Sequence, residues 1–144
     1  MLHTHSRIWI HLVWTTKRRE PILNKEIRIR LFDFLIGKGK TIEMPFEKLN
    51  IQPEHVHALI DLPTNKTVAE FMQLIKGSSS HMLNQDIFKA KFNWQRGYGA
   101  YSVSSLQLDV VRNYIANQSK HHQKTAFANE YEAWKREYGV IDDM

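Results

Sequence analysis

Gln52-Pro53-Glu54-His55-Val56-His57-Ala58-Leu59-Ile60 is the stretch around which the rest of this chain is organised. Proline cannot donate to the interior of a β-ladder, so Pro53 marks the start of a strand. Side chains repeat every two residues along a strand, so His55 and His57 project from one face with Cα atoms roughly 6.6 Å apart. Two imidazoles at this spacing can bind one divalent cation. The pair is equally compatible with a half-buried strand that merely contains two histidines.

The composition is that of an ordinary globular protein, with 144 residues, 42% of them hydrophobic and 24% charged. This length suits one well-buried domain, so we predict a single domain over residues 1–144. No apolar run reaches the ~18 residues of a membrane span, and the first residues lack the apolar segment of a signal peptide. We therefore expect a cytoplasmic protein without a membrane partner.

Cysteine is absent, which excludes disulfides and thiolate metal sites and leaves His, Asp, Glu and Gln as metal ligands. The net charge of +5 and the isoelectric point near 9.5 favour a polyanionic partner. A basic run such as Lys17-Arg18-Arg19 is more often a solvated turn than a phosphate contact. This run and the basic cluster Lys120-His121-His122 are nevertheless the candidates for binding nucleic acid.

Hydrophobic periodicity predicts strands on both sides of the histidine strand. The four predicted strands cover residues 6–14, 41–52, 55–62 and 92–103. The second and third are separated so briefly that they should form a tight antiparallel hairpin. The last is rich in aromatic residues and broken by two glycines, which suggests a bulge.

Four helices are predicted between and after these strands. The first is capped by Asn24 and should end at Gly37 and Gly39, and the second opens with a Thr67–Glu70 capping box. The segment 77–80, Gly-Ser-Ser-Ser, should interrupt the second helix or line a nucleic-acid groove with hydroxyls. The third helix is predicted to open with a capping box at residues 104–107 and to reach about residue 122. The fourth is predicted over about residues 125–138.

The order strand, helix, strand, strand, helix, strand, followed by further helices, is the split βαβ pattern. It predicts an α+β fold in which a ferredoxin-like antiparallel sheet carries helices on one face. The C-terminal helices are expected as additions to this core.

A tyrosine and a glutamine one helical turn apart give the histidine pair a chemical interpretation. The face of the third helix that should pack on the sheet consists of Leu108, Val111 and Ile115. Tyr114 and Gln118 lie on a neighbouring stripe of that helix. Taken alone, Tyr114 is more often an aromatic residue at the edge of a core. Beside the histidine strand, Tyr114 can instead act as a nucleophile, and Gln118 can complete a metal site with His55 and His57.

These residue types suit phosphodiester chemistry. A bound Mg²⁺ or Mn²⁺ would withdraw charge from a phosphate oxygen, and imidazole and amide ligands suit Mn²⁺ and, less ideally, Mg²⁺. A phenol has an unperturbed pKa near 10, so Tyr114 must lose its proton as it attacks. The predicted product is a 5′-phosphotyrosine with a free 3′-hydroxyl, and rejoining from it needs no ATP.

The sequence resembles the small single-tyrosine HUH transposases, which move bacterial insertion sequences as single-stranded DNA. This family includes the insertion-sequence-200-like transposases and their REP-associated relatives. The resemblance covers nearly the whole chain. Its motifs, in order, are HLVWTTKRREP at 11–21, PEHVH at 53–57, KGSSS at 76–80, WQRGYGAYSVS at 94–104 and YIANQSKHH at 114–122.

The resemblance implies metal ligation by His55, His57 and Gln118, covalent catalysis by Tyr114 and an obligate homodimer. It also implies an enzyme that cuts and rejoins single-stranded DNA at hairpin-marked ends. Two alternatives remain open. One is a non-catalytic ferredoxin-like module that binds nucleic acid, and the other is a metal-dependent nuclease that uses water and forms no covalent adduct.

Overall fold

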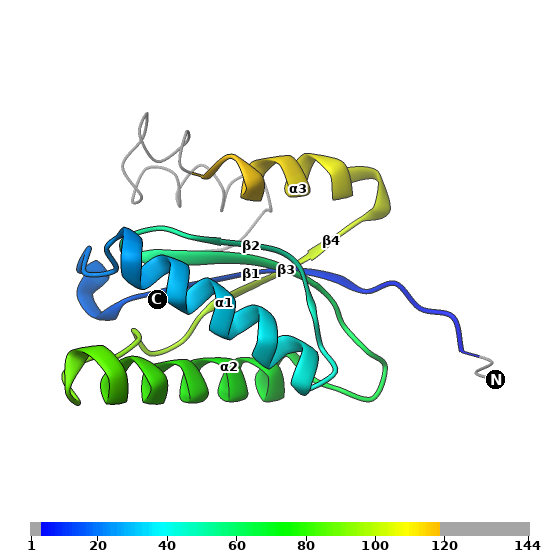
Figure 1. Cartoon of the computed structure of the whole chain (residues 1–144). Helices are drawn as coiled ribbons and strands as arrows, with labels where there is room; N and C mark the ends of the chain where they lie inside the picture. Colours follow the sequence, from blue (N-terminus) through cyan, green and yellow to red (C-terminus); the bar gives the residue numbers. More distant parts are fainter. Residues whose placement is uncertain (1–3, 119–144) are drawn as a thin grey trace.

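The computed structural model describes residues 4–118, which form a four-stranded antiparallel sheet with helices on both faces (Figure 1). The strands are β1 (Trp9–Thr15), β2 (Phe46–Ile51), β3 (His55–Asp61) and β4 (Gly99–Val103). Their order across the sheet is β2-β3-β1-β4, and every neighbouring pair is antiparallel. This topology confirms the predicted α+β, ferredoxin-like fold.

Helices α1 (Lys25–Thr41) and α2 (Val68–Leu83) cover one face of the sheet, and α3 (Leu108–Ala116) covers the other (Figure 1). Single helical turns connect the elements at η1 (Lys17–Arg19), η2 (Asn84–Phe88) and η3 (Ser105–Gln107). Among the helices of residues 4–118, none combines the length and apolar character that a membrane crossing needs.

The alternation of side chains along β1 and β3 divides the apolar residues between two clusters. Leu12 and Ala58 point into the larger cluster beneath α1 and α2. Leu59, one residue further along β3, belongs to the smaller cluster, where Val111 and Ile115 of α3 pack on the sheet. The strand parity that the sequence predicts therefore decides which residues of β3 face α3.

The predicted starts of α1 and α2 are confirmed. Oδ1 of Asn24 accepts a hydrogen bond from the amide of Ile27 at 2.9 Å, which caps α1. The capping box of α2 is complete, because the Thr67 hydroxyl accepts from the Glu70 amide and the Glu70 carboxylate accepts from the Thr67 amide.

The prediction that glycines end α1 was wrong. The helix continues through Gly37 and Gly39 to Thr41, so β2 begins only at Phe46 and not at residue 41. Gly39 instead allows the backbone of Met44 to approach the helix closely, since a Cβ at Gly39 would lie 3.1 Å from the carbonyl oxygen of Met44. The chain reverses at Glu43, whose φ of 59° is the left-handed conformation that glycine usually supplies.

The predicted interruption at residues 77–80 was also wrong. Helix α2 runs through this segment without a break. The Ser78 hydroxyl donates to the carbonyl of Leu74, and the Ser79 hydroxyl donates to the carbonyl of Ile75, both at 2.6 Å. These hydroxyls donate within the helix, which accommodates the serines without a break.

The region from residue 92 to residue 118 is less regular than predicted. Only Gly99–Val103 forms a strand, while Trp94 makes an isolated bridge with Thr16. Ser104 makes no side-chain cap, and the chain enters α3 through η3. The prediction that this helix continues to about residue 122 was wrong, because α3 ends at Ala116 and Asn117 is its C-cap. The predicted helix over residues 125–138 lies outside the described residues. The single domain over residues 1–144 stays a prediction.

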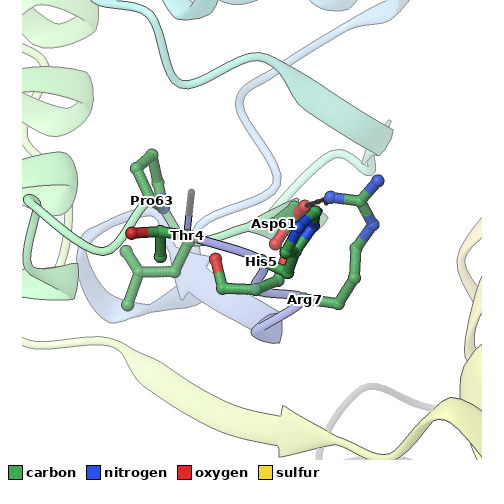
Figure 2. Close-up of a pocket in the computed structure, with 7 residues that line it drawn as sticks. Thr4, His5, Arg7, Asp61 and Pro63 are labelled. Carbon is green, nitrogen blue, oxygen red and sulfur yellow. Dashed lines mark hydrogen bonds and ion pairs between the residues drawn. The ribbon is translucent and has the colours of Figure 1, made fainter. Parts of the chain in front are cut away.

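The two ends of β3 are fixed in different ways. At its start, the amide of Gln52 donates to the carbonyl of His55 at 2.8 Å, which closes the predicted hairpin with β2. At its end, Asp61 accepts from the Ile8 amide at 3.0 Å and pairs with Arg7 at 3.3 Å (Figure 2). The hollow beside this pair lies at the opposite end of β3 from His55.

Candidate active site

The two histidines of β3 lie beneath α3 and not on an open surface. His55 is 0% exposed to solvent and His57 is 1% exposed. His11 of β1 lies beside them, with its Nε2 atom 3.0 Å from Nδ1 of His57. Because β1 pairs with β3, Val13 is the ladder partner of His57, and His11 is the partner of Leu59. His11 therefore belongs to the buried polar cluster.

Glu54 fixes the tautomer of His55. Its Oε1 atom lies 2.7 Å from Nδ1 of His55, and both side chains are buried. A carboxylate only accepts hydrogen bonds, so in the neutral imidazole Nδ1 carries the proton and Nε2 keeps a lone pair. A carboxylate behind one ring nitrogen is the usual means of orienting the other nitrogen toward a metal.

Gln118 presents its amide oxygen to that lone pair. Its Nε2 atom donates to the backbone carbonyl of Tyr114 at 3.3 Å, which turns Oε1 toward Nε2 of His55 at 3.4 Å. Two electron-pair donors therefore face one another in a buried position. This arrangement suits a shared cation better than a hydrogen bond.

The tautomer of His57 depends on His11. Ligation through Nε2 of His57 requires that its Nδ1 carries the proton and donates it to Nε2 of His11. Burial lowers the pKa of His11 from 6.5 to about 3, so this ring is neutral at pH 7 and can accept. His11 thus stands behind His57 in the position that Glu54 holds behind His55.

Tyr114 lies over the histidines of its own chain. Its ring centroid is 5.5 Å from that of His57 and 6.1 Å from that of His11, with the rings nearly perpendicular in both pairs. The phenol is only partly buried, because Tyr114 lies at the edge of the cluster. Its helix is held by the smaller apolar cluster and by Arg112, which pairs with Glu47 of β2 at 2.9 Å.

The structure brings His55, His57, Gln118 and Tyr114 into one cluster. The basic run of residues 17–19 lies outside the cluster, on the exposed turn η1 that follows β1. The other predicted nucleic-acid-binding residues lie outside the described part of the chain; they are Lys120, His121 and His122.

Sequence reasoning missed the role of Glu54. Strand alternation assigns neighbouring residues to opposite faces, which separates Glu54 from His55. Glu54 in fact lies in the turn before β3, where alternation does not apply. The available signal was the proline at position 53, since the residue after the strand-breaking Pro53 is still part of the turn.

Whether the cluster fits a metal depends on the glutamine. Within residues 4–118, no three His, Cys, Asp or Glu side chains are grouped so that they could hold a metal ion. Two histidines and one amide oxygen make up the donor set instead. This set is buried, carries no formal charge and leaves positions open, which is compatible with Mg²⁺ or Mn²⁺ shared with phosphate oxygens and water.

Comparison with known proteins adds independent findings. Residues 4–118 match the family model of IS200-like transposases. The ISDra2 transposase TnpA of Deinococcus radiodurans is 24% identical over 115 residues, which span 75% of this chain and 81% of that protein. The transposase of insertion sequence element IS200 from Salmonella typhimurium is 26% identical over 124 residues, which span 82% of this chain and 81% of that protein.

Two solved structures share the fold. A candidate transposase from Deinococcus radiodurans has a TM-score of 0.68 at 22% identity, covering 82% of this chain and 95% of that chain. A REP-associated tyrosine transposase, solved with a bound REP hairpin, has a TM-score of 0.63 at 18% identity, covering 85% of this chain and 74% of that chain. These two structures confirm the fold.

Proposed function

This chain belongs to the family of IS200-like transposases, and from that premise we propose that it cuts and rejoins single-stranded DNA through a covalent bond to Tyr114. The observation that supports the proposal most is the position of the Tyr114 ring, 5.5 Å from His57 on a cluster that also contains His55 and Gln118. A phenol and a set of metal-ligand atoms thus lie side by side.

The covalent step conserves the phosphodiester. The Tyr114 oxygen forms a bond to phosphorus and loses its proton, while the bond from phosphorus to the 3′-oxygen breaks and that oxygen gains a proton. The product is a 5′-phosphotyrosine beside a free 3′-hydroxyl. Attack by a 3′-hydroxyl reverses the step, so joining requires no further energy source.

The buried polar residues prepare the site for this step. Nε2 of His55, Nε2 of His57 and Oε1 of Gln118 would hold Mg²⁺ or Mn²⁺, which supplies Lewis-acid charge withdrawal from a phosphate oxygen when bound. Glu54 and His11 hold the tautomers that leave both Nε2 atoms as electron-pair donors. The apolar side of α3 keeps Tyr114 at the edge of the cluster.

We expect Glu54→Gln to reduce the affinity for Mn²⁺ by about ten- to a hundredfold, the range for a group that orients a metal ligand. The amide removes the carboxylate charge behind His55 and can donate to Nδ1, which would place the proton on Nε2. Calorimetric titration of the folded protein with Mn²⁺ measures the change. Glu26→Gln on α1 is the matched control, and equal affinities of the two variants would contradict the role of Glu54.

Single-stranded DNA with hairpin ends is the proposed substrate. The net charge of +5 supports a polyanionic partner, and the REP-associated relative was solved with a hairpin. A denaturing gel of labelled strands from the flanks of the gene, incubated with Mg²⁺ or Mn²⁺, tests the proposal. A cut strand attached to protein supports it. A cut strand without attached protein indicates a water-using nuclease, and binding without cutting indicates a binding module.

We also propose a two-fold dimer. β4 is an edge strand of the sheet in the described part of the chain, so a second copy can pair along it. Sedimentation equilibrium at micromolar concentration should give twice the chain mass of 17.0 kDa. A mass of 17.0 kDa under these conditions would exclude a stable dimer.

A further inference from the structure

A hollow of about 690 Å³ lies beside the candidate active site, between η1 and the segment that leads into β4. We call it the Arg18–Tyr98 hollow. The side chains and backbone that matter for its chemistry belong to Arg18, Arg19, Gln95, Arg96, Gly97 and Tyr98.

The walls of this hollow are tied together. The Arg18 amide donates to Oε1 of Gln95 at 3.0 Å, and the Gln95 amide donates to the carbonyl of Thr15 at 2.9 Å. From α2, the ammonium of Lys76 donates to the carbonyls of Gln95 and Gly97, each at 2.8 Å. Hydrogen bonds from three separate segments therefore fix the loop before β4, so the hollow is preformed.

The hollow is suited to an anion. The guanidinium groups of Arg18 and Arg96 are exposed and have no carboxylate partner in the part of the chain that the structure describes. Lys76 holds two carbonyls of the loop. The amides of residues 96, 97 and 98 have no acceptor within residues 4–118. Successive amides of this kind, beside cationic side chains, form concavities that bind phosphate.

Tyr98 adds an aromatic surface to the same hollow. This residue is 42% exposed, so its side chain is accessible to a ligand in the hollow. A π-face beside a cationic groove is the arrangement that binds unpaired nucleotides, because every base can stack on it.

The hollow adjoins the histidines through the sheet. Val13 lines it and is the ladder partner of both His57 on β3 and Gly99 on β4. Residues directly opposite in an antiparallel pair have Cα atoms only about 4.5–5.5 Å apart. A strand of DNA that runs from a phosphate at His57 across β1 would have its neighbouring nucleotide at this hollow.

We propose that the Arg18–Tyr98 hollow holds one unpaired nucleotide next to the scissile phosphate, with its base stacked on Tyr98 and its phosphate bound by Arg18, Arg96 and the loop amides. The proposal rests on the proposed function, since it takes the substrate to be a single strand crossing the histidine cluster. It adds a site that excludes paired bases, because a base within a duplex cannot present its face to Tyr98.

Binding of two 20-nucleotide strands tests the stacking. One is dT20, and the other has an abasic tetrahydrofuran unit at every position; both are measured by fluorescence anisotropy in EDTA. In the unmodified protein dT20 should bind more tightly. Tyr98→Ala should lower the ratio of the affinity for dT20 to that for the abasic strand by about tenfold, the effect of losing one stacked base. Tyr98→Phe should preserve this affinity ratio. An affinity ratio that Tyr98→Ala leaves unchanged would overturn the proposal.

The salt dependence of dT20 binding tests the phosphate contacts. Arg96→Ala should make the slope of log K against log salt shallower by about 0.7, the contribution of one phosphate contact on a single strand. Lys40→Ala, in the last turn of α1, is the charge-matched control and should leave the slope unchanged. Equal slopes for the two variants would remove the phosphate contact from the proposal.

The binding assays and the cleavage assay can refute the two proposals independently. EDTA prevents metal-dependent cutting, so the Tyr98 effect does not depend on catalysis by Tyr114. If Tyr98→Ala lowers the affinity ratio but the protein never cuts DNA, the hollow binds an unpaired nucleotide and the proposed function fails. If Tyr114-dependent cutting occurs but Tyr98→Ala leaves the affinity ratio unchanged, only the proposal for the hollow is wrong.

Discussion

Replacing Tyr114 by phenylalanine should reduce strand cleavage by at least about a thousandfold and abolish the protein–DNA adduct. The substitution removes one oxygen and keeps the ring that contacts His57 and His11. Folding and DNA binding should therefore change little. The residual rate reflects only what a water molecule can do at the same phosphate.

Tyr101→Phe is the matched control for this experiment. Tyr101 lies on β4 directly opposite His11, so the same atom is removed from a tyrosine of a neighbouring strand. Cleavage should survive in this control and vanish in Tyr114→Phe on the same gel. Cleavage at the normal rate by Tyr114→Phe would favour a water-using nuclease, and loss only in Tyr101→Phe would transfer the role to that residue.

His57→Asn should reduce cleavage by about a thousandfold, because Lewis-acid stabilisation of a phosphate contributes several kcal/mol. The side-chain amide of asparagine reaches about as far as Nδ1 of histidine, so it can still donate to His11. It does not reach the position of Nε2, the proposed ligand atom. His55→Asn should have a similar effect, with the bond to Glu54 retained.

The choice of asparagine follows from burial. Both histidines are almost fully buried, so they are not surface ligands that alanine could replace without affecting the fold. Alanine would leave a cavity and unsatisfied partners. His81→Asn, on the exposed end of α2, is the matched control, and circular dichroism confirms that each variant is folded. Normal cleavage by His57→Asn would refute the assignment of the metal site.

The sheet and the order of its strands could be predicted because their signals are local and consistent. Alternation in β3 assigns His55 and His57 to one face and Val56 to the other, and the capping residues Asn24 and Thr67 fix two helix starts. Tyr114 and Gln118 are four residues apart, although α3 ends at Ala116 and Gln118 lies just beyond its C-cap. This spacing was enough to propose Tyr114 and Gln118 as partners from the sequence, and the structure places both residues next to the histidines.

The errors arose where tertiary contacts override local preference. Gly39 favours a helix end, yet packing of the Met44 carbonyl against it allows α1 to continue. Ser79 favours a break, but its hydroxyl bonds within α2 and accepts from Nε1 of Trp94 at 2.9 Å. The local sequence around Gly39 does not show how the Met44 carbonyl will pack against it. The local sequence around Ser79 likewise does not show its contact with Trp94.

The supporting residues of the site were the least predictable. His11 is 46 residues from His57 in sequence, and only the β1–β3 register brings the two rings together. Glu54 acts from a turn, to which strand periodicity does not apply. A sequence pattern can thus propose the atoms that bind or attack, but the groups that contact those residues depend on the completed fold.

Mass spectrometry of the trapped protein–DNA complex tests the central claim most directly. The protein is incubated with single strands from the flanks of its gene and Mg²⁺ or Mn²⁺, denatured, and digested with nuclease and protease. The account predicts that a nucleotide remains attached to the peptide that carries Tyr114, at the phenol oxygen. A nucleotide on any other residue, or cut DNA with no modified peptide, would contradict it.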